Sequence, residues 1–193
     1  SAGHTREELL ELVESAPQWR TEDIPRGITA PDTPARGFPF TDLGNAERLI
    51  ASQGDNLRYC VDRGQWLFWT GKRWEPDATG EALRRAKEVI RGMYELLPQQ
   101  QGKAASDAIY AHIKKSESRP RVEAMVALAR ILEGVAVRET DLDADPMLLN
   151  CLNGTVDLTT GRLTVHNRND LISKLCPVEY DPQAKAPRWE RFL

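Results

Sequence analysis

Cysteine is scarce in this chain of 193 residues and follows no recognisable pattern. Cys60, Cys151 and Cys176 are odd in number and widely spaced, and no CxxC pair occurs. A disulfide framework or a zinc ribbon would need paired or closely spaced cysteines. The sequence therefore predicts three small buried or half-buried thiols in a reducing cytoplasm.

Long apolar runs are also missing. The longest one, Ala124 to Ala129, is far shorter than the roughly 18 residues needed to cross a bilayer. No basic start is followed by an apolar stretch and a small-residue cleavage site, so we expect neither a secretory signal nor a membrane partner.

Charge of one sign is not in large excess. The chain has 26 Lys and Arg against 29 Asp and Glu, a net charge of −3. This excludes a uniformly basic, histone-like binder of nucleic acid but leaves room for a local basic face. With 40% hydrophobic residues the chain can bury a core, and its length suits one large domain or two small ones.

The motifs of nucleotide hydrolysis and of common hydrolases are absent. The phosphate-binding pattern GxxxxGK[ST] does not occur, because Gly71-Lys72 and Gly102-Lys103 lack the following hydroxyl that binds magnesium. His4, His112 and His166 are isolated, and no HExxH or GxSxG pattern appears. We therefore expect no ATP site of this kind and no catalytic residues in this chain.

One acidic segment admits a different interpretation. Asp141, Asp143 and Asp145 alternate and could hold the two cations of a nucleotidyl transferase. Only Leu142 supplies a strand-forming apolar residue there, so a solvated loop is the favoured interpretation. Metal-dependent nucleotidyl transfer remains the lowest-ranked alternative.

Proline and glycine divide the chain near residue 40. The stretch before it contains Pro25, Pro31, Pro34 and Pro39, which forbid regular structure. Residues 1–39 are predicted to form a short N-terminal helix and a Pro-rich linker or arm. Residues 40–193 are predicted to form the folded domain.

The folded part predicts an α+β domain, with central helices flanked by two small antiparallel β meanders. Three helices followed by a hairpin is also the element order of a winged helix, which stays open as one arrangement. Thr41 and Gly54 are predicted to begin and end the first helix, and Asn153-Gly154 is predicted to be a hairpin turn. The expected strands are residues 57–61, 65–70, 73–75, 148–152, 155–158 and 162–166, and the three later helices span about 79–97, 103–115 and 119–132.

A local excess of positive charge lies in the helical middle. Residues 81–138 carry a net charge of +4 and the rest of the chain −7. Lys114, Lys115, Arg119 and Arg121 surround the short junction between two helices, where they could neutralise DNA phosphates. These four residues are the predicted nucleic-acid-binding site, and an ordinary solvated helix face is the alternative.

The first meander is rich in aromatic residues interleaved with cations, a mixture that suits single-stranded nucleic acid. Strand alternation places Trp66 and Phe68 on one face and Leu67 and Trp69 on the other. A small sheet packed against helices uses at least one face as core, so core packing is the favoured interpretation. The aromatic residues concerned are Tyr59, Trp66, Phe68, Trp69 and Trp74.

Two sequence blocks resemble a region of phage and plasmid primases. The first is Phe40-Thr41-Asp42-Leu43-Gly44-Asn45-Ala46-Glu47-Arg48-Leu49, with Leu57-Arg58-Tyr59 and Trp66-Leu67-Phe68-Trp69-Thr70-Gly71-Lys72-Arg73-Trp74 after it. The second is Leu149-Asn150-Cys151-Leu152-Asn153-Gly154-Thr155-Val156-Asp157-Leu158-Thr159-Thr160-Gly161-Arg162-Leu163. The resemblance covers about residues 40–193.

In that family the region precedes a superfamily III helicase and often follows a primase domain; the poxvirus primase–helicase is a distant relative. The resemblance implies a parent protein that unwinds DNA as a ring, usually a hexamer, in the replication of a prophage or plasmid. It also implies that ATP and Mg bind in a helicase domain beyond the end of this chain. None of the family's catalytic motifs is present, so no catalytic residue is carried over.

Two functions of different classes follow. The first is a non-catalytic accessory domain of a primase–helicase that binds DNA, places the helicase ring, or does both. The second is an oligomerisation or linker collar that makes no DNA contact.

Overall fold

The computed structural model describes residues 37–192, and the first helix among these residues is α2 (Asp42–Gln53). The short helix and most of the linker predicted for residues 1–39 lie outside the described residues. The described residues belong to a single unit, residues 33–193. The remaining α-helices are α3 (Glu81–Gly92), α4 (Lys103–Ser116), α5 (Arg119–Ala129) and the short α6 (Pro187–Glu190).

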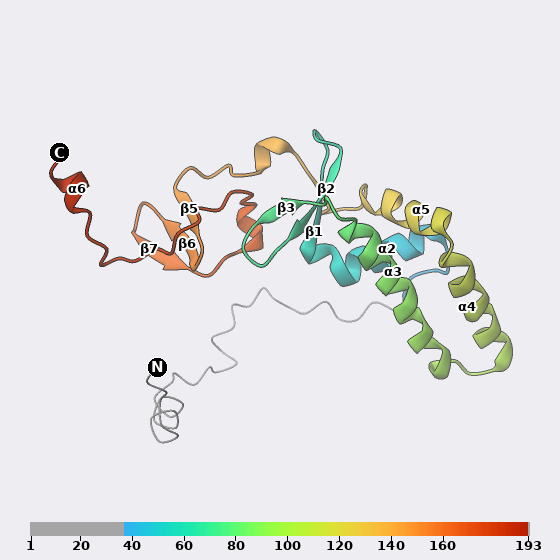
Figure 1. Ribbon diagram of the computed structural model, residues 1–193. Coiled ribbons are helices and arrows are strands. Elements are labelled where there is room, and N and C mark those ends of the chain that lie inside the picture. Colours follow the sequence, from blue (N-terminus) through green and yellow to red (C-terminus); the bar gives the residue numbers. More distant parts are fainter. Residues whose placement is uncertain (1–36, 193) are drawn as a thin grey trace, which may run out of the picture. The chain divides into compact units, whose positions relative to one another are not determined.

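Two small sheets accompany these helices, and four short 3₁₀ segments connect the elements of residues 37–192 (Figure 1). The α+β class predicted from the sequence is therefore confirmed. The strands are β1 (Leu57–Cys60), β2 (Gln65–Trp69), β3 (Trp74–Pro76), β4 (Ala136–Val137), β5 (Leu148–Cys151), β6 (Gly154–Asp157) and β7 (Arg162–Thr164). The 3₁₀ segments are η3 (Gly54–Asn56), η4 (Met93–Gln99), η5 (Glu139–Asp141) and η6 (Arg168–Asp170).

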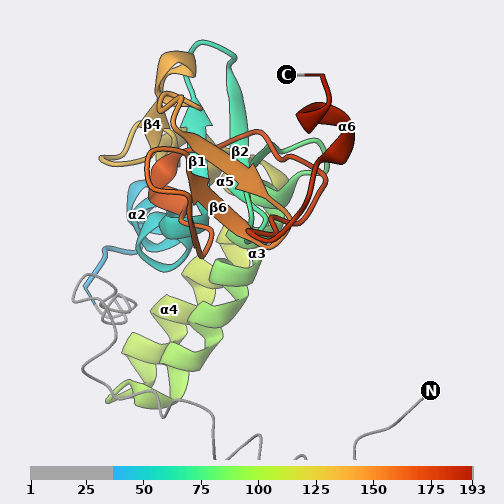
Figure 2. The same ribbon diagram turned by 90° about the vertical axis from the view of Figure 1, so that its left-hand side faces the viewer.

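The helical core forms because apolar residues repeat at helical spacing. On α3, Ala82, Ala86 and Ile90 recur every four residues and are all buried. They pack with buried residues of α2, α4 and α5, while α3 and α4 run side by side in both views (Figures 1 and 2). The predicted first long helix ends earlier than expected, because the chain tightens into η4 before Pro98.

The first sheet has the strand order β3-β2-β1-β4. Strands β1, β2 and β3 pair antiparallel as the sequence predicts, but β4 adds to β1 in parallel. The winged-helix arrangement is therefore not the one that forms. The strand that follows the helices returns to the first sheet, and the later hairpin pairs with β7 instead.

The second sheet has the order β5-β6-β7 and confirms the predicted hairpin, with one correction. Cys151 pairs with Gly154, so the two loop residues are Leu152 and Asn153, one position earlier than predicted. Gly154 is needed for a different reason: it has φ 154°, and a Cβ there would lie 2.3 Å from the Thr164 carbonyl oxygen of β7.

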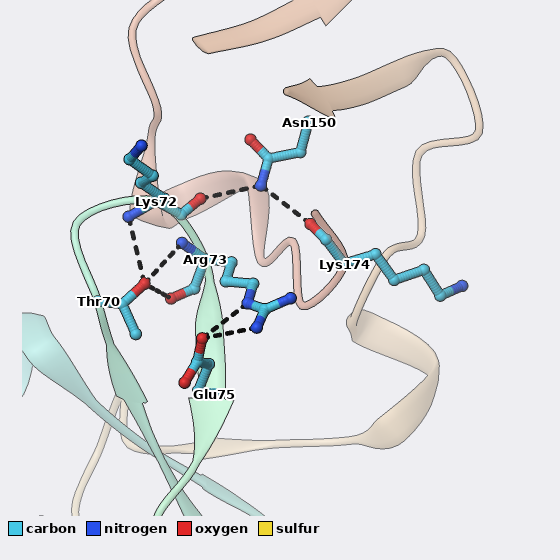
Figure 3. A network of polar contacts seen from close by, with 6 residues as sticks. All are labelled: Thr70, Lys72, Arg73, Glu75, Asn150 and Lys174. Carbon is cyan, nitrogen blue, oxygen red and sulfur yellow. Dashed lines mark hydrogen bonds and ion pairs between the residues drawn. The ribbon is translucent and has the colours of Figure 1, made fainter. Parts of the chain in front are cut away.

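The second sheet is joined to the first by a polar network (Figure 3). The buried Asn150 amide donates to the carbonyl oxygens of Lys72 at 3.0 Å and Lys174 at 2.9 Å. Lys72 Nζ in turn donates to the Leu152 carbonyl oxygen at 2.7 Å. The fully buried Trp74 donates its indole N–H to the Arg168 carbonyl oxygen at 2.8 Å.

Some predicted helix signals are confirmed and others are wrong. The Thr41 hydroxyl accepts from the Gly44 N–H at 3.1 Å, and the Asp77 carboxylate accepts the Glu81 and Ala82 N–H groups of α3. Gly54 follows the last residue of α2 as predicted, but it has φ −60° and not the left-handed conformation of a glycine stop, because the chain continues into η3. Within residues 37–192, no helix combines the length and the apolar character needed to span a bilayer.

Candidate nucleic-acid interface

The four cations predicted to bind nucleic acid all lie at the junction of α4 and α5. Only Glu117 and Ser118 separate the two helices, so Lys114 and Lys115 in the last turn of α4 come close to Arg119 and Arg121 in α5. The structure therefore brings the predicted residues together, and the Ser118 side chain makes no cap hydrogen bond to α5. Its hydroxyl donates to the Lys115 carbonyl oxygen instead.

Three of the four cations already have carboxylate partners. Lys114 Nζ lies 3.3 Å from Glu117, and Arg119 Nε lies 2.7 Å from Glu123. In each case the hydrogen bond to the carboxylate raises the pKa of the cation. These pairs are exposed, so they reduce the local positive charge without fixing the side chains strongly.

Arg121 forms the third pair, with Asp42 in the first turn of α2 at 2.5 Å. The hydrogen bond to Asp42 raises the pKa of Arg121. This contact joins two helices, whereas the other two pairs lie within a turn of chain. Lys115 is exposed and has no ion pair among residues 37–192, so it is the junction cation most available to a phosphate.

A polar cluster next to the junction joins α2 to the end of α4. The Asn45 amide donates to the Ser116 hydroxyl at 3.0 Å, and His112 Nε2 lies 3.1 Å from Asn45 Oδ1. Arg48, only 4% exposed, donates to the same Asn45 oxygen and to the carbonyl oxygens of Phe38 and Pro39. Burial, followed by the charge of Arg48, lowers the pKa of His112.

Beside the junction is a basic cleft that reasoning from the sequence missed. It has a volume of about 240 Å³ and is lined by Lys87, Ile90 and Arg91 of α3 together with Glu117 and Val122. Lys87 and Arg91 lie four residues apart, so they share a helix face, and neither has an ion pair among the residues described. Two cations four residues apart on one predicted helix were the available sequence signal.

The aromatic residues of the first meander have mixed positions. Trp74 is fully buried, which confirms core packing for that ring. Trp66 and Phe68 are half-buried against the helical core, and Trp69 is half-buried in a second cluster around Trp74. Tyr59 is also half-buried and meets Trp66 edge to face at 5.4 Å.

The three alternating aspartates serve separate loops. Asp143 accepts the Ser173 N–H at 2.8 Å, Asp141 accepts the Arg138 N–H, and Asp145 accepts the Met147 N–H. Across residues 37–192 there is no group of three or more His, Cys, Asp or Glu side chains placed to hold a metal ion. The geometry gives nucleotidyl transfer no support.

Comparison with known proteins identifies one family. The family model described as "D5 N terminal like" matches residues 46–193. No curated protein matches the chain. The matched range contains the α4–α5 junction, the basic cleft and both sheets, and it begins within α2.

Proposed function

Because the D5 N-terminal-like family, to which this chain belongs, is associated with primases and helicases, we propose that the domain is a non-catalytic accessory domain that contacts DNA for its parent enzyme. In this proposal ATP, Mg and the motor belong to a superfamily III helicase domain that follows the chain, and a primase domain can precede it. The working protein is a cytoplasmic ring, a hexamer, that acts in phage, prophage or plasmid replication. The domain helps to place this ring on its template.

The observation that carries DNA contact is the set of unpaired cations around one junction. Lys115 on α4 and Lys87 and Arg91 on α3 have no ion pair among the described residues. Each phosphate that such a residue neutralises releases condensed counterions, which makes binding salt-dependent. Placed together, they supply a binding surface even though the whole chain is slightly acidic.

Fluorescence anisotropy with forked, single-stranded and double-stranded oligonucleotides tests this function. We expect binding at low salt that weakens as salt rises. Lys115→Glu combined with Lys87→Glu should reduce the affinity at least tenfold and flatten the salt dependence, since two phosphate contacts are lost. Lys103→Glu, the same substitution at the far end of α4, is the control for each single change, Lys115→Glu or Lys87→Glu, and should bind like the unaltered protein.

The collar without DNA contact is the second candidate. It is favoured by the three ion pairs at Lys114, Arg119 and Arg121, which leave less positive charge than the sequence suggests. The same titrations separate the two functions, because a collar would bind no oligonucleotide even at low salt. Hydrolysis of ATP or primer synthesis by this chain would contradict both.

A further inference from the structure

A second groove, which we call the aromatic groove, lies between the first sheet and helices α3 and α5. Residues of α3 and α5 also line the basic cleft, and we call the line of contact between these two helices the α3–α5 seam. The aromatic groove has a volume of about 400 Å³ and contains the half-buried rings of Tyr59 and Trp66. Leu83 of α3 and Ala127 of α5 form its helical side. The Arg130 guanidinium lies over the Tyr59 ring, 5.7 Å from its centre. Ring faces and a guanidinium plane are the surfaces on which nucleobases stack.

The aromatic groove has one cation without a carboxylate partner among the described residues, Arg130, and two acidic side chains that are already engaged. Its two acids are engaged: Glu123 pairs with Arg119, and Asp77 accepts the first N–H groups of α3. Arg130 has no carboxylate partner among residues 37–192. The groove therefore offers an available cation beside its rings, while its two carboxylates are already engaged in contacts within the fold.

The aromatic groove and the basic cleft follow one seam between α3 and α5. Leu83 lines the groove and Arg91 lines the cleft, eight residues farther along α3. At 1.5 Å per residue this separation is about 12 Å. It corresponds to about three to four nucleotides at the 3.4 Å spacing of a stacked strand. Val122 of α5 lines the cleft and Ala127 of α5 lines the groove, so both helices span the same two sites.

We propose that the α3–α5 seam binds single-stranded DNA, with phosphates at Lys87 and Arg91 and a base stacked in the aromatic groove at Tyr59, Trp66 and Arg130. This inference rests on the proposed function and adds the form of DNA and its path. Duplex DNA does not fit this role, because its bases are already stacked on one another and present only their edges.

Changing the DNA rather than the protein gives the first test. A twelve-nucleotide thymidine strand is compared by anisotropy with a twelve-nucleotide strand that is abasic at every position, which keeps every phosphate and removes every base. We expect the abasic strand to bind about tenfold more weakly than the intact strand, because it has no base to stack in the aromatic groove. A matched duplex should also bind more weakly than the single strand, because its bases are not free to enter the groove. Equal affinity for the intact and abasic strands would overturn the proposal while leaving phosphate binding intact.

Filling the groove gives the second test. Ala127 is exposed on α5, so Ala127→Leu should fold normally and occupy the space that a base needs. It should weaken binding of the intact strand about tenfold but leave the abasic strand unchanged. Ala111→Leu, on an exposed position of α4 outside the groove, is the control. If Ala127→Leu instead changes only the oligomeric state in sedimentation, the groove contacts a second copy and the proposal is wrong.

These experiments distinguish a failure of the proposed DNA contact from a failure of the single-strand inference. If the unaltered protein binds no oligonucleotide at low salt, both the proposed function and this inference are wrong. Binding that depends on Lys87 and Lys115, but on neither the bases nor Ala127, would remove this inference alone.

Discussion

Arg121 and Asp42 form a 2.5 Å ion pair across 79 residues of sequence. It joins the start of α5 to the first turn of α2, where a negative side chain is also favoured by the helix dipole. The side chains of Arg121 and Asp42 are 36% and 28% exposed. One of the four cations that the sequence assigns to DNA therefore holds two helices together.

A double-mutant cycle on this pair separates its structural role from DNA contact. Asp42→Asn, Arg121→Gln and their combination should give a coupling energy of about 0.2–1 kcal/mol, since the pair is partly exposed. Urea unfolding followed by tryptophan fluorescence measures it. Arg121→Gln should weaken DNA binding less than Lys115→Gln does, and an equal or larger effect would contradict this ranking.

Two glycines on helices should respond to alanine in opposite directions. A Cβ on Gly44 would lie 2.0 Å from the Pro39 carbonyl oxygen, so Gly44→Ala should destabilise the fold by about 1–3 kcal/mol. Gly92 ends α3 in a helical conformation with open space around it, so Gly92→Ala should stabilise by about 0.5–1 kcal/mol. Thermal unfolding of both variants checks the signs, and destabilisation by Gly92→Ala would contradict the geometry.

Stability should fall as the solution becomes acidic, through His112. Burial lowers the pKa of His112 below its usual value of 6.5, so the unfolded chain takes up a proton before the folded one does. This contribution is present above about pH 6.5 and is lost as the pH falls through the lower folded value. Urea unfolding between pH 7.5 and 5 should show the loss, and His112→Gln should reduce the slope. An unchanged slope in that variant would assign the pH dependence to other groups.

Among the polar side chains at the contact between the two sheets, Asn150 should be the one whose substitution lowers the stability of the fold most. Its amide donates to two carbonyl oxygens, and its oxygen accepts from the Thr155 hydroxyl at 3.2 Å. Asn150→Ala removes the partner of two carbonyl oxygens and of the buried Thr155 hydroxyl, and it should cost about 1–3 kcal/mol. Asn169→Ala, on an exposed side chain, should change stability by less than about 0.5 kcal/mol. Urea titrations of the two variants give the comparison, and equal stability would show that Asn150 is not essential to the contact.

Local signals in the sequence determined the type and position of most elements. Periodicity places α2, α4 and α5 and the first meander within a few residues, and Thr41 acts as the predicted cap of α2. The signals failed where a glycine had two explanations. Gly54 is predicted to end a helix and Gly154 to lie in a turn. In the structure Gly54 begins η3, and Gly154 is needed because its backbone lies close to β7.

By itself, the sequence determined the α+β class, the elements and the resemblance to primase-associated proteins, because propensity, periodicity and motif blocks act over short spans of chain. Tertiary structure alone decided which charges remain available. It paired Arg121 with Asp42, left Lys87 and Arg91 unpaired beside Glu117, and brought Tyr59 and Trp66 to the same seam as Arg130. These relationships join residues from distant parts of the chain, and only the packing of α3 and α5 against the sheet fixes their distances.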